Sequence, residues 1–327
     1  MNRSREMRLA DLSIYTLFYL CEGSGRPVNL GRSRADPLAV YLKCAAALNR
    51  SLSRYGAAVT ILTNQPERLA DLQRCHGTAV AQQPMAFTLA VPETIGFRAA
   101  HFKLEAIRHF ASGAWGEVVL LLDADVLALS GIRLRLPQSP FLMGYRLEDE
   151  SRDPQLLRSK ALLLNGRAAV CERWWGGEFL LGNPAGFGAI SPVIDEIFPR
   201  YATHFQRCAH QGDEMVMNAA LDLAQSRTPV DPGSLTLEEC NPAGVISRWW
   251  SVRTPEPGPP LKAALRSSLI HLPADKTLLA QVFDEGDPGT QTAKLLQRRL
   301  ARKTRALRYL RPLLPLLSPA RPRAPRL

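Results

Sequence analysis

Up to residue 130 the sequence alternates between two kinds of segment, and this alternation restricts the possible folds more than any other feature. Runs rich in apolar, aromatic and β-branched residues predict strands at 12–21, 57–64, 85–91 and 117–129. Helical patterns lie between them, at 36–55, from Pro66 onward and at 97–112. Strands that alternate with helices form a parallel sheet flanked by helices. The sequence therefore predicts a Rossmann-like α/β fold with a mostly parallel sheet, in which ligands bind at the carboxyl ends of the strands.

The second half of the chain is less regular. Strands are expected at 141–146, 176–183 and 267–273, and helices at 191–205 and 212–226. The segment "TPEPGPP" at 254–260 predicts a rigid break. With 327 residues and 46% hydrophobic content, the chain can bury one large core, with or without a smaller annex.

Cysteine usage and hydropathy bear on where the protein works. The six cysteines, at 21, 44, 75, 171, 208 and 240, form no C-x-x-C pair and favour free thiols in a reducing compartment. The N-terminal apolar stretch is broken by Asp11, Ser13 and Tyr15, which does not fit a signal peptide. No run reaches the length of roughly 18 apolar residues that a membrane span requires. We therefore expect a cytoplasmic protein.

The net charge of +11 is confined to the C-terminal segment. Residues 294–327 contain eleven Lys/Arg and no Asp or Glu, so the remaining 30 basic and 30 acidic residues balance. The pattern over 291–311 is that of a basic amphipathic helix, and a Pro-rich stretch follows it. We expect this tail to contact an anionic membrane surface, peripherally on the inner face. A solvated tail is the alternative, and nucleic-acid binding is disfavoured because the rest of the chain is neutral.

Two carboxylates, Asp123 and Asp125, interrupt the apolar run "EVVLLLDADVLAL". On a strand, residues two apart face the same side, so both side chains would point together. Such carboxylates repel each other unless a cation lies between them, and hard divalent metals prefer oxygen ligands. The sequence thus suggests a metal site, with a turn-forming or helix-capping pair as the alternative.

The motif and its surroundings resemble the D-x-D glycosyltransferases of the GT-A fold, most closely the glycogenin-like, retaining group. Four segments between 97 and 276 carry the resemblance. "HFKLEAIRHF" with "GEVVLLLDADVLAL" is similar to that group's Lys-bearing helix and D-x-D strand, and "WWGGEFLLGNPAGF" stands in the place of its "fNsGvm" strand. "GDEMVMNAAL" resembles its "GDQ..LN" helix start, and "IHLPADK" its late His…Gly…Lys loop.

The resemblance implies a role for individual residues. Its metal ligands would be Asp123, Asp125 and His271, holding Mn²⁺ or Mg²⁺. A nucleotide-sugar donor, by family default a UDP-sugar, would contact Lys103, Asp123, Gly177 and Lys276. Asp213 would lie beside the donor sugar and the acceptor. The plainer alternatives are an ordinary strand histidine, a lysine on a solvated helix face and an aspartate that caps a helix.

Two departures from the family pattern matter for the chemistry. The spacing from His271 to Lys276 is one residue shorter than in the family, and Ala274 takes the place of its Gly. Glu178 is an additional carboxylate in the segment "WWGGEFLLG", and inverting GT-A enzymes often carry their base on a similar W-G-G-E segment. Glu178 and Asp213 are therefore the candidate catalytic residues, and both retaining and inverting outcomes stay open.

The resemblance implies a metal-dependent hexosyltransferase that moves a sugar to a hydroxyl of a lipid-linked or cell-envelope glycan. Residues 1–285 would form the GT-A domain, with a nucleotide half at 10–130 and an acceptor half at 131–285, followed by the basic tail at 286–327. The pairs Trp174–Trp175 and Trp249–Trp250 could stack on sugars or simply pack. Arg167, Arg173 and Arg248 could meet an anionic acceptor.

Two other readings remain open. A haloacid dehalogenase-type phosphatase also carries D-x-D after a strand, but Leu127 stands where such enzymes have Thr. An inactive membrane adaptor of the same fold is the second.

Overall fold

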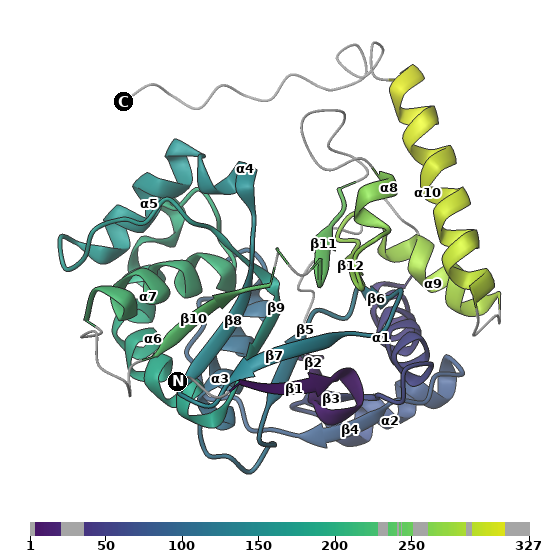
Figure 1. Ribbon diagram of the computed structural model, residues 1–327, viewed down its shortest axis with the longest axis horizontal. Helices are drawn as coiled ribbons and strands as arrows, with labels where there is room; N and C mark the ends of the chain where they lie inside the picture. The colour runs from purple at the N-terminus through teal and green to yellow at the C-terminus, as the bar shows by residue number, and fades with distance from the viewer. Residues whose placement is uncertain are drawn as a thin grey trace.

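A seven-stranded sheet runs through the centre of the molecule (Figure 1). The computed structural model describes residues 4–20, 36–227, 235–240, 242, 244–250, 261–285 and 290–310. In spatial order the strands are β10 (Thr236–Glu239), β8 (Phe141–Arg146), β9 (Trp175–Gly182), β5 (Val119–Leu122), β2 (Ser13–Leu17), β3 (Val59–Thr63) and β4 (Ala81–Pro84). Strand β9 runs antiparallel to both its neighbours, and the other pairings are parallel. The predicted mostly parallel α/β sheet is confirmed.

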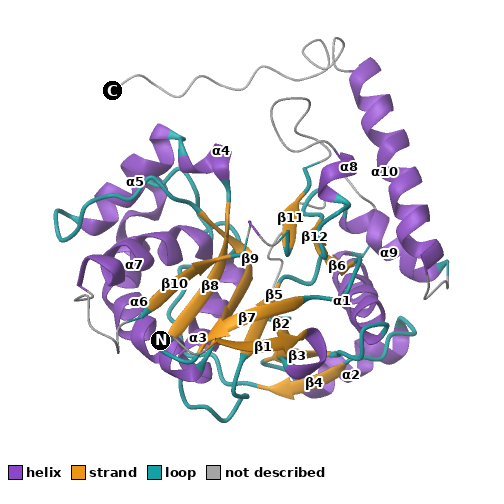
Figure 2. Cartoon of the chain, viewed as in Figure 1, coloured by secondary structure: helices purple, strands orange, loops and turns teal. Residues whose placement is uncertain are grey.

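Helices flank this sheet (Figure 2). The larger ones include α1 (Pro37–Ser53), α2 (Pro66–Cys75), α3 (Lys103–Phe110), α5 (Pro154–Leu164), α6 (Pro184–His204), α7 (Asp213–Arg227) and α9 (Lys276–Asp284). Shorter pieces are η1 (Leu9–Asp11), η2 (Arg98–Phe102), α4 (Glu148–Ser151), η3 (Phe205–Arg207) and α8 (Leu261–Ala264). Four helices begin with Pro at the first helical position, where its missing N–H is harmless. Asp36, Asp153 and Asn183 cap three of them through their side chains.

Two small sheets complete the fold. Strand β1 (Ser4–Arg8) pairs antiparallel with β7 (Arg133–Pro137). The other small sheet contains β11 (Ile246–Arg248), β12 (Leu269–His271) and β6 (Val126–Ala128), with β12 in the middle. In its register His271 lies opposite Val126. This pairing brings a late segment of the chain against the residue that follows Asp125.

The structure differs from the sequence prediction at two strands. The run 117–129 is two strands, β5 and β6, in different sheets, and Asp123 to Asp125 form the turn between them. The strand expected at 85–91 is wrong, since β4 is Ala81–Pro84. Backbone N–H groups of Thr88 and Leu89 donate to the carboxylate of Glu105, so they are not available for a strand ladder.

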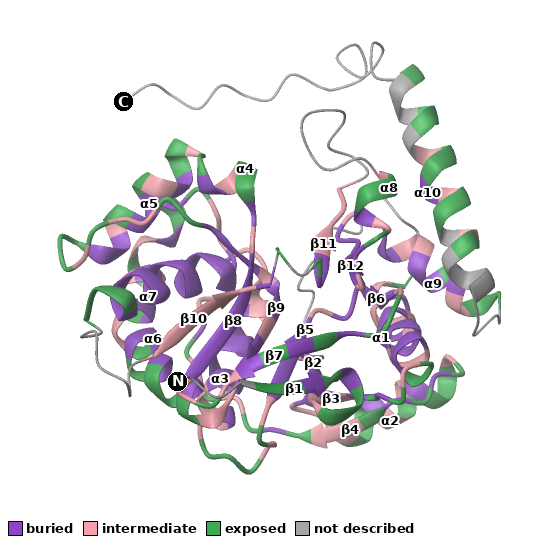
Figure 3. Cartoon of the chain, viewed as in Figure 1, coloured by how far each residue is buried: buried purple, intermediate pink, exposed green. Residues whose placement is uncertain are grey.

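Buried residues concentrate in the central strands and on the inner faces of the helices (Figure 3). A large hydrophobic cluster surrounds the seven-stranded sheet, and a second one joins α1, α9 and β12. Leu300 belongs to this second cluster. None of the helices in the described ranges has the length and hydropathy needed to cross a lipid bilayer.

The helix predicted at 291–311 is present as α10 (Thr290–Leu310). It lies against α9 at the edge of the molecule (Figure 1). The predicted break at 254–260 and the Pro-rich stretch after residue 310 lie outside the described residues.

Candidate metal and nucleotide site

The two aspartates of the D-x-D motif lie in a turn at the carboxyl end of β5. Asp123 leaves the strand while its N–H still donates to the carbonyl of Glu178, at 3.1 Å. The N–H of Val126 closes the turn on the carbonyl of Asp123, at 3.2 Å. The carbonyl of Asp125 accepts the N–H of Leu272, at 3.0 Å, which ties the turn to the end of β12. The turn is therefore fixed by backbone bonds to two strands.

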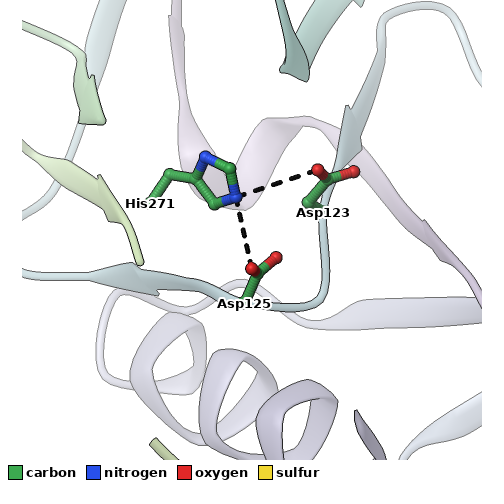
Figure 4. Close-up of side chains that lie close together, drawn as sticks. All are labelled: Asp123, Asp125 and His271. Atoms are coloured by element: carbon green, nitrogen blue, oxygen red, sulfur yellow. Dashed lines mark ion pairs between the residues drawn. The ribbon is translucent and has the colours of Figure 1, made fainter. Parts of the chain in front are cut away.

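His271, the last residue of β12, faces this turn (Figure 4). Its Nε2 lies 3.3 Å from Oδ2 of Asp125 and 3.8 Å from Oδ2 of Asp123. One ligand atom from each of the three residues lies within 4.8 Å of the others. The structure thus brings together the three residues that the sequence resemblance nominated as metal ligands.

Two lysines neutralise the carboxylates. Lys103, at the start of α3, donates to Oδ1 of Asp123 at 2.8 Å and to the carbonyl of Gly177 at 2.9 Å, and pairs with Asp213 at 2.8 Å. Lys276 pairs with Asp125 and donates to the carbonyl of Pro273 at 3.0 Å. Both ammonium groups are buried, so they form a fixed positive lining beside the aspartates.

Burial and neighbouring charges act in opposite directions on these groups. Burial disfavours the imidazolium of His271, but the carboxylates of Asp125 and Glu178 outweigh it and raise its pKa to about 9. Burial also opposes ionisation of Asp125, yet Lys276 and His271 hold the pKa of that carboxyl well below its ordinary value. Burial raises the pKa of Asp213 even though Lys103 opposes the shift. Asp213 is therefore easier to protonate than an exposed aspartate, although it still pairs with Lys103.

The donor set fits a hard divalent cation. Two carboxylate oxygens and one imidazole nitrogen converge, and both oxygen and nitrogen donors suit Mn²⁺. Asp123 keeps 29% of its side chain exposed, which leaves the cluster open to solvent on that side. A binding cation would compete with protons for His271, and with Lys276 for Asp125.

Gly177 and Asp213 lie next to each other, and both contact Lys103. A Cβ added at Gly177 would lie 3.3 Å from Oδ2 of Asp213, so the small residue permits their close approach. Lys103, Gly177 and Asp213 line a cavity whose remaining walls are mostly apolar side chains of the sheet, α3 and α7, with Glu238 of β10 as a further charged residue. Asp213 thus lines the cavity, and its expected place beside the donor sugar and the acceptor stays a prediction.

Glu178 lies elsewhere. Its side chain is fully buried, and its Oε1 accepts from Nε of Arg248 at 2.9 Å while Oε2 binds the same guanidinium. The same Oε1 of Glu178 also lies 3.4 Å from Nδ1 of His271. The structure therefore joins this predicted catalytic carboxylate to the histidine and not to an exposed position.

Sequence reasoning missed the roles of three residues around Glu178. Arg248 on β11 also donates to Glu214 at 2.7 Å, and Glu214 accepts the N–H of Gly177 at 2.9 Å. Asn218 accepts the N–H of Trp175 at 2.7 Å and donates to its carbonyl at 2.9 Å. The helical spacing of Glu214 and Asn218 in "GDEMVMN" places both on one face of α7, which was the available signal.

The tryptophans are mostly structural. Trp174 is buried and donates its indole N–H to Glu214, and the buried ring of Trp175 packs over Gly144. Trp249 is half-buried and donates its backbone N–H to the carbonyl of His271, at 2.9 Å. Arg167 pairs with Glu196, so of the three arginines suggested for an acceptor, only Arg173 is exposed without an ion pair among the described residues.

The sequence matches no protein-family model, and no curated protein matches it. Three of the solved structures that it resembles are structures of glycosyltransferases. The galactosyltransferase LgtC in complex with donor and acceptor sugar analogues has a TM-score of 0.44 and 14% identity, over 82% of this chain and 95% of that one. An active-site mutant of LgtC has a TM-score of 0.43 and 13% identity, over 82% of this chain and 95% of that one. The apo form of mouse xyloside xylosyltransferase 1 has a TM-score of 0.44 and 9% identity, over 80% of this chain and 97% of that one. At these identities the similarity concerns the fold, and function has to be argued from the site.

Proposed function

We propose that this chain is a glycosyltransferase that moves a sugar from a nucleoside diphosphate donor to a hydroxyl of an acceptor. The observation that carries the proposal is the convergence of Asp123, Asp125 and His271 at the carboxyl edge of the sheet, with Lys103 and Lys276 beside them. Such a set suits a divalent cation together with a diphosphate. The donor is proposed to be a UDP-sugar and the cation Mn²⁺ or Mg²⁺, in line with the sequence resemblance.

A bound cation would act as a Lewis acid that stabilises the diphosphate as it leaves. The residues of the chain would position the reacting groups. Lys103 and Lys276 lie beside the carboxylates and would also donate to phosphate or sugar oxygens of the donor, with little reorganisation because the fold already holds both ammonium groups there. Asp213, which lines the cavity, would stabilise positive charge on the sugar or take the proton of the acceptor hydroxyl.

We assign a different role to each part of the chain under this proposal. Residues 10–130 would bind the nucleotide, and residues 131–285 would bind the acceptor, for which a lipid-linked or cell-envelope glycan is proposed. The segment 286–327 would hold the enzyme on the anionic inner face of a membrane. Neither the phosphatase nor the inactive adaptor is favoured by a specific feature of the site.

The test is release of UDP from a panel of UDP-sugars, with Mn²⁺ or with EDTA. The wild-type protein should release UDP with at least one donor in Mn²⁺, and EDTA should abolish the release. Asp125→Asn should lower kcat/KM about a hundredfold or more, because removing one electrostatic contribution to the transition state typically has an effect of this order. Unchanged turnover in Asp125→Asn or in EDTA contradicts the proposal. Phosphate release from p-nitrophenyl phosphate would instead indicate the phosphatase.

A further inference from the structure

His271 uses one ring nitrogen for the aspartates and presents the other to Glu178. Nε2 faces Asp123 and Asp125, and Nδ1 lies 3.4 Å from Oε1 of Glu178. Strand pairing fixes the backbone of His271 on both sides, but it does not fix the rotation of the ring or its tautomer. Among the described residues, the buried Nδ1 makes no hydrogen bond as the side chains stand, and Oε1 of Glu178 is the carboxylate oxygen that faces it.

Glu178 itself is held rigidly. Arg248 contacts both of its carboxylate oxygens and extends to Glu214 on α7. A planar guanidinium that meets a carboxylate through two N–H groups fixes both the charge and the orientation of that carboxylate. The buried charge of Glu178 is thus compensated, and its position is set by β11.

Gly176 explains the rest of the placement. The carboxylate of Glu178 lies over the α-carbon of Gly176, and a Cβ at that position would overlap it. The Gly therefore leaves space for the carboxylate beside the strand, where it can reach both Arg248 and His271. The segment Gly176-Gly177-Glu178, where this chain departs from the glycosyltransferase pattern, therefore has the small residue that the Glu178 side chain needs beside it.

We propose that Glu178 is a positioning residue for the metal site, held by Arg248 and seated on Gly176. It would accept the Nδ1–H of His271 and so present Nε2, with its lone pair, to the cation. Carboxylates behind metal-binding histidines fix the tautomer and the ring orientation in this way. This inference rests on the proposed function, because it assigns Glu178 to cation binding. It replaces the sequence-based expectation that Glu178 is a base that touches the acceptor.

The experiment measures binding of Mn²⁺ alone, from the EPR signal of the free ion, for the full-length protein and three variants. Glu178→Gln should weaken binding about tenfold to a hundredfold, the usual effect of losing such a carboxylate. Gly176→Ala keeps every charge but displaces the carboxylate, and should also weaken binding, at least about threefold on the same grounds. If Glu178→Gln does not fold, the Mn²⁺ affinity of Gly176→Ala tests the inference in its place.

Glu214→Gln is the matched control, because it removes a buried carboxylate from the same guanidinium without touching His271. Its Mn²⁺ affinity should remain within about twofold of wild type, whatever its thermal stability. Equal losses in Glu178→Gln and Glu214→Gln, or no loss in Glu178→Gln, overturn the inference while the proposed function stands. If wild-type protein binds no Mn²⁺, the metal-dependent function and the inference both fail.

Discussion

At the scale of single residues, the candidate site is a set of paired charges, most of them buried. Asp123 and Asp213 share Lys103, Asp125 pairs with Lys276, and Glu178 pairs with Arg248. Removing one partner of a buried pair leaves the other charge uncompensated and usually destabilises the fold by several kcal/mol. Substitutions that keep shape, such as Asp to Asn and Glu to Gln, are therefore the informative ones at this site.

His101, in the short helix η2 before α3, is a buried titratable residue outside this set of charges. His101 contacts the hydroxyl of Tyr201 at 3.0 Å and the carbonyl of Phe97 at 3.1 Å. Burial lowers the pKa of His101 to about 4 from its ordinary value of 6.5. Between these values the unfolded chain binds a proton that the folded protein does not, so this stabilising contribution is complete above pH 6.5 and is lost as pH falls toward 4.

We predict that His101→Gln removes this dependence. The free energy of unfolding of the wild type minus that of His101→Gln should fall by about 3 kcal/mol between pH 7 and pH 4, the value of 2.5 pKa units. Urea unfolding at a series of pH values measures it, and the difference between the two proteins cancels the titration of other groups. A difference that is constant over this range contradicts the burial of a neutral His101.

The residues that the sequence identified share a local signal, and those it missed do not. Asp123 and Asp125 could be found because two carboxylates in an apolar run are conspicuous, and His271 because of the motif around it. The partnership of Glu178 with Arg248 joins positions 70 residues apart, and β11 has only three residues. No periodicity reports such a contact, since it depends on how the third sheet packs against β9.

At the scale of elements, the D-x-D turn brings Asp123 and Asp125 together in a different way from the one that the sequence suggested. The strand pleat was expected to point Asp123 and Asp125 the same way, but both lie in the turn between β5 and β6. Their common direction comes from backbone bonds to β9 and to the end of β12. The run looked continuous because Val126 to Ala128 are as buried and apolar as β5, although they belong to another sheet.

The contact between α6 and β8 allows a test at this scale. Gly186, in the first turn of α6, packs against the backbone of Phe141, and a Cβ there would lie 2.6 Å from the carbonyl carbon of Phe141. The N–H of Phe141 also donates to the capping side chain of Asn183, at 3.1 Å. Helix and strand backbones are thus in direct contact, and neither can move without breaking hydrogen bonds.

We predict that Gly186→Ala destabilises the protein by more than about 2 kcal/mol, because overpacking against backbone forces a shift of the element. Gly188→Ala is the matched control on the same helix. Its Cβ would meet the Cβ of Ala111 at 3.8 Å, an ordinary contact, and Ala favours the helix by up to about 1 kcal/mol over Gly. Thermal and urea unfolding measure both. Similar stabilities for the two variants would show that α6 is not seated on β8 as described.

At the scale of the whole molecule, α10 is part of the fold at one face and free at another. Leu300 is fully buried in the second hydrophobic cluster, Arg299 pairs with Glu285, and Lys303 pairs with Asp275. Asp275 directly precedes Lys276, the partner of Asp125. The contact between α10 and Asp275 therefore helps to hold the segment that carries Lys276.

The outward face of α10 is a basic stripe. Its exposed side chains follow helical spacing, at Lys294, Gln297, Arg298, Ala301, Arg302, Arg305, Ala306 and Tyr309. Since Leu300 already packs inside the protein, the described part of α10 offers charge and one exposed tyrosine to a membrane, and not the leucine at 300. Binding through this stripe would be electrostatic.

The replacement of Arg298, Arg302 and Arg305 by Gln should therefore weaken binding to phosphatidylserine-rich vesicles roughly a hundredfold, because each basic residue near such a surface contributes about 1 kcal/mol. Vesicle sedimentation at low and high salt measures it, and screening by salt should weaken wild-type binding in the same direction. Arg299→Gln, which removes a basic residue already paired with Glu285, should change binding far less. Equal binding of wild type to phosphatidylcholine vesicles, or no loss in the triple variant, would mean that the stripe is solvated and does not anchor the enzyme.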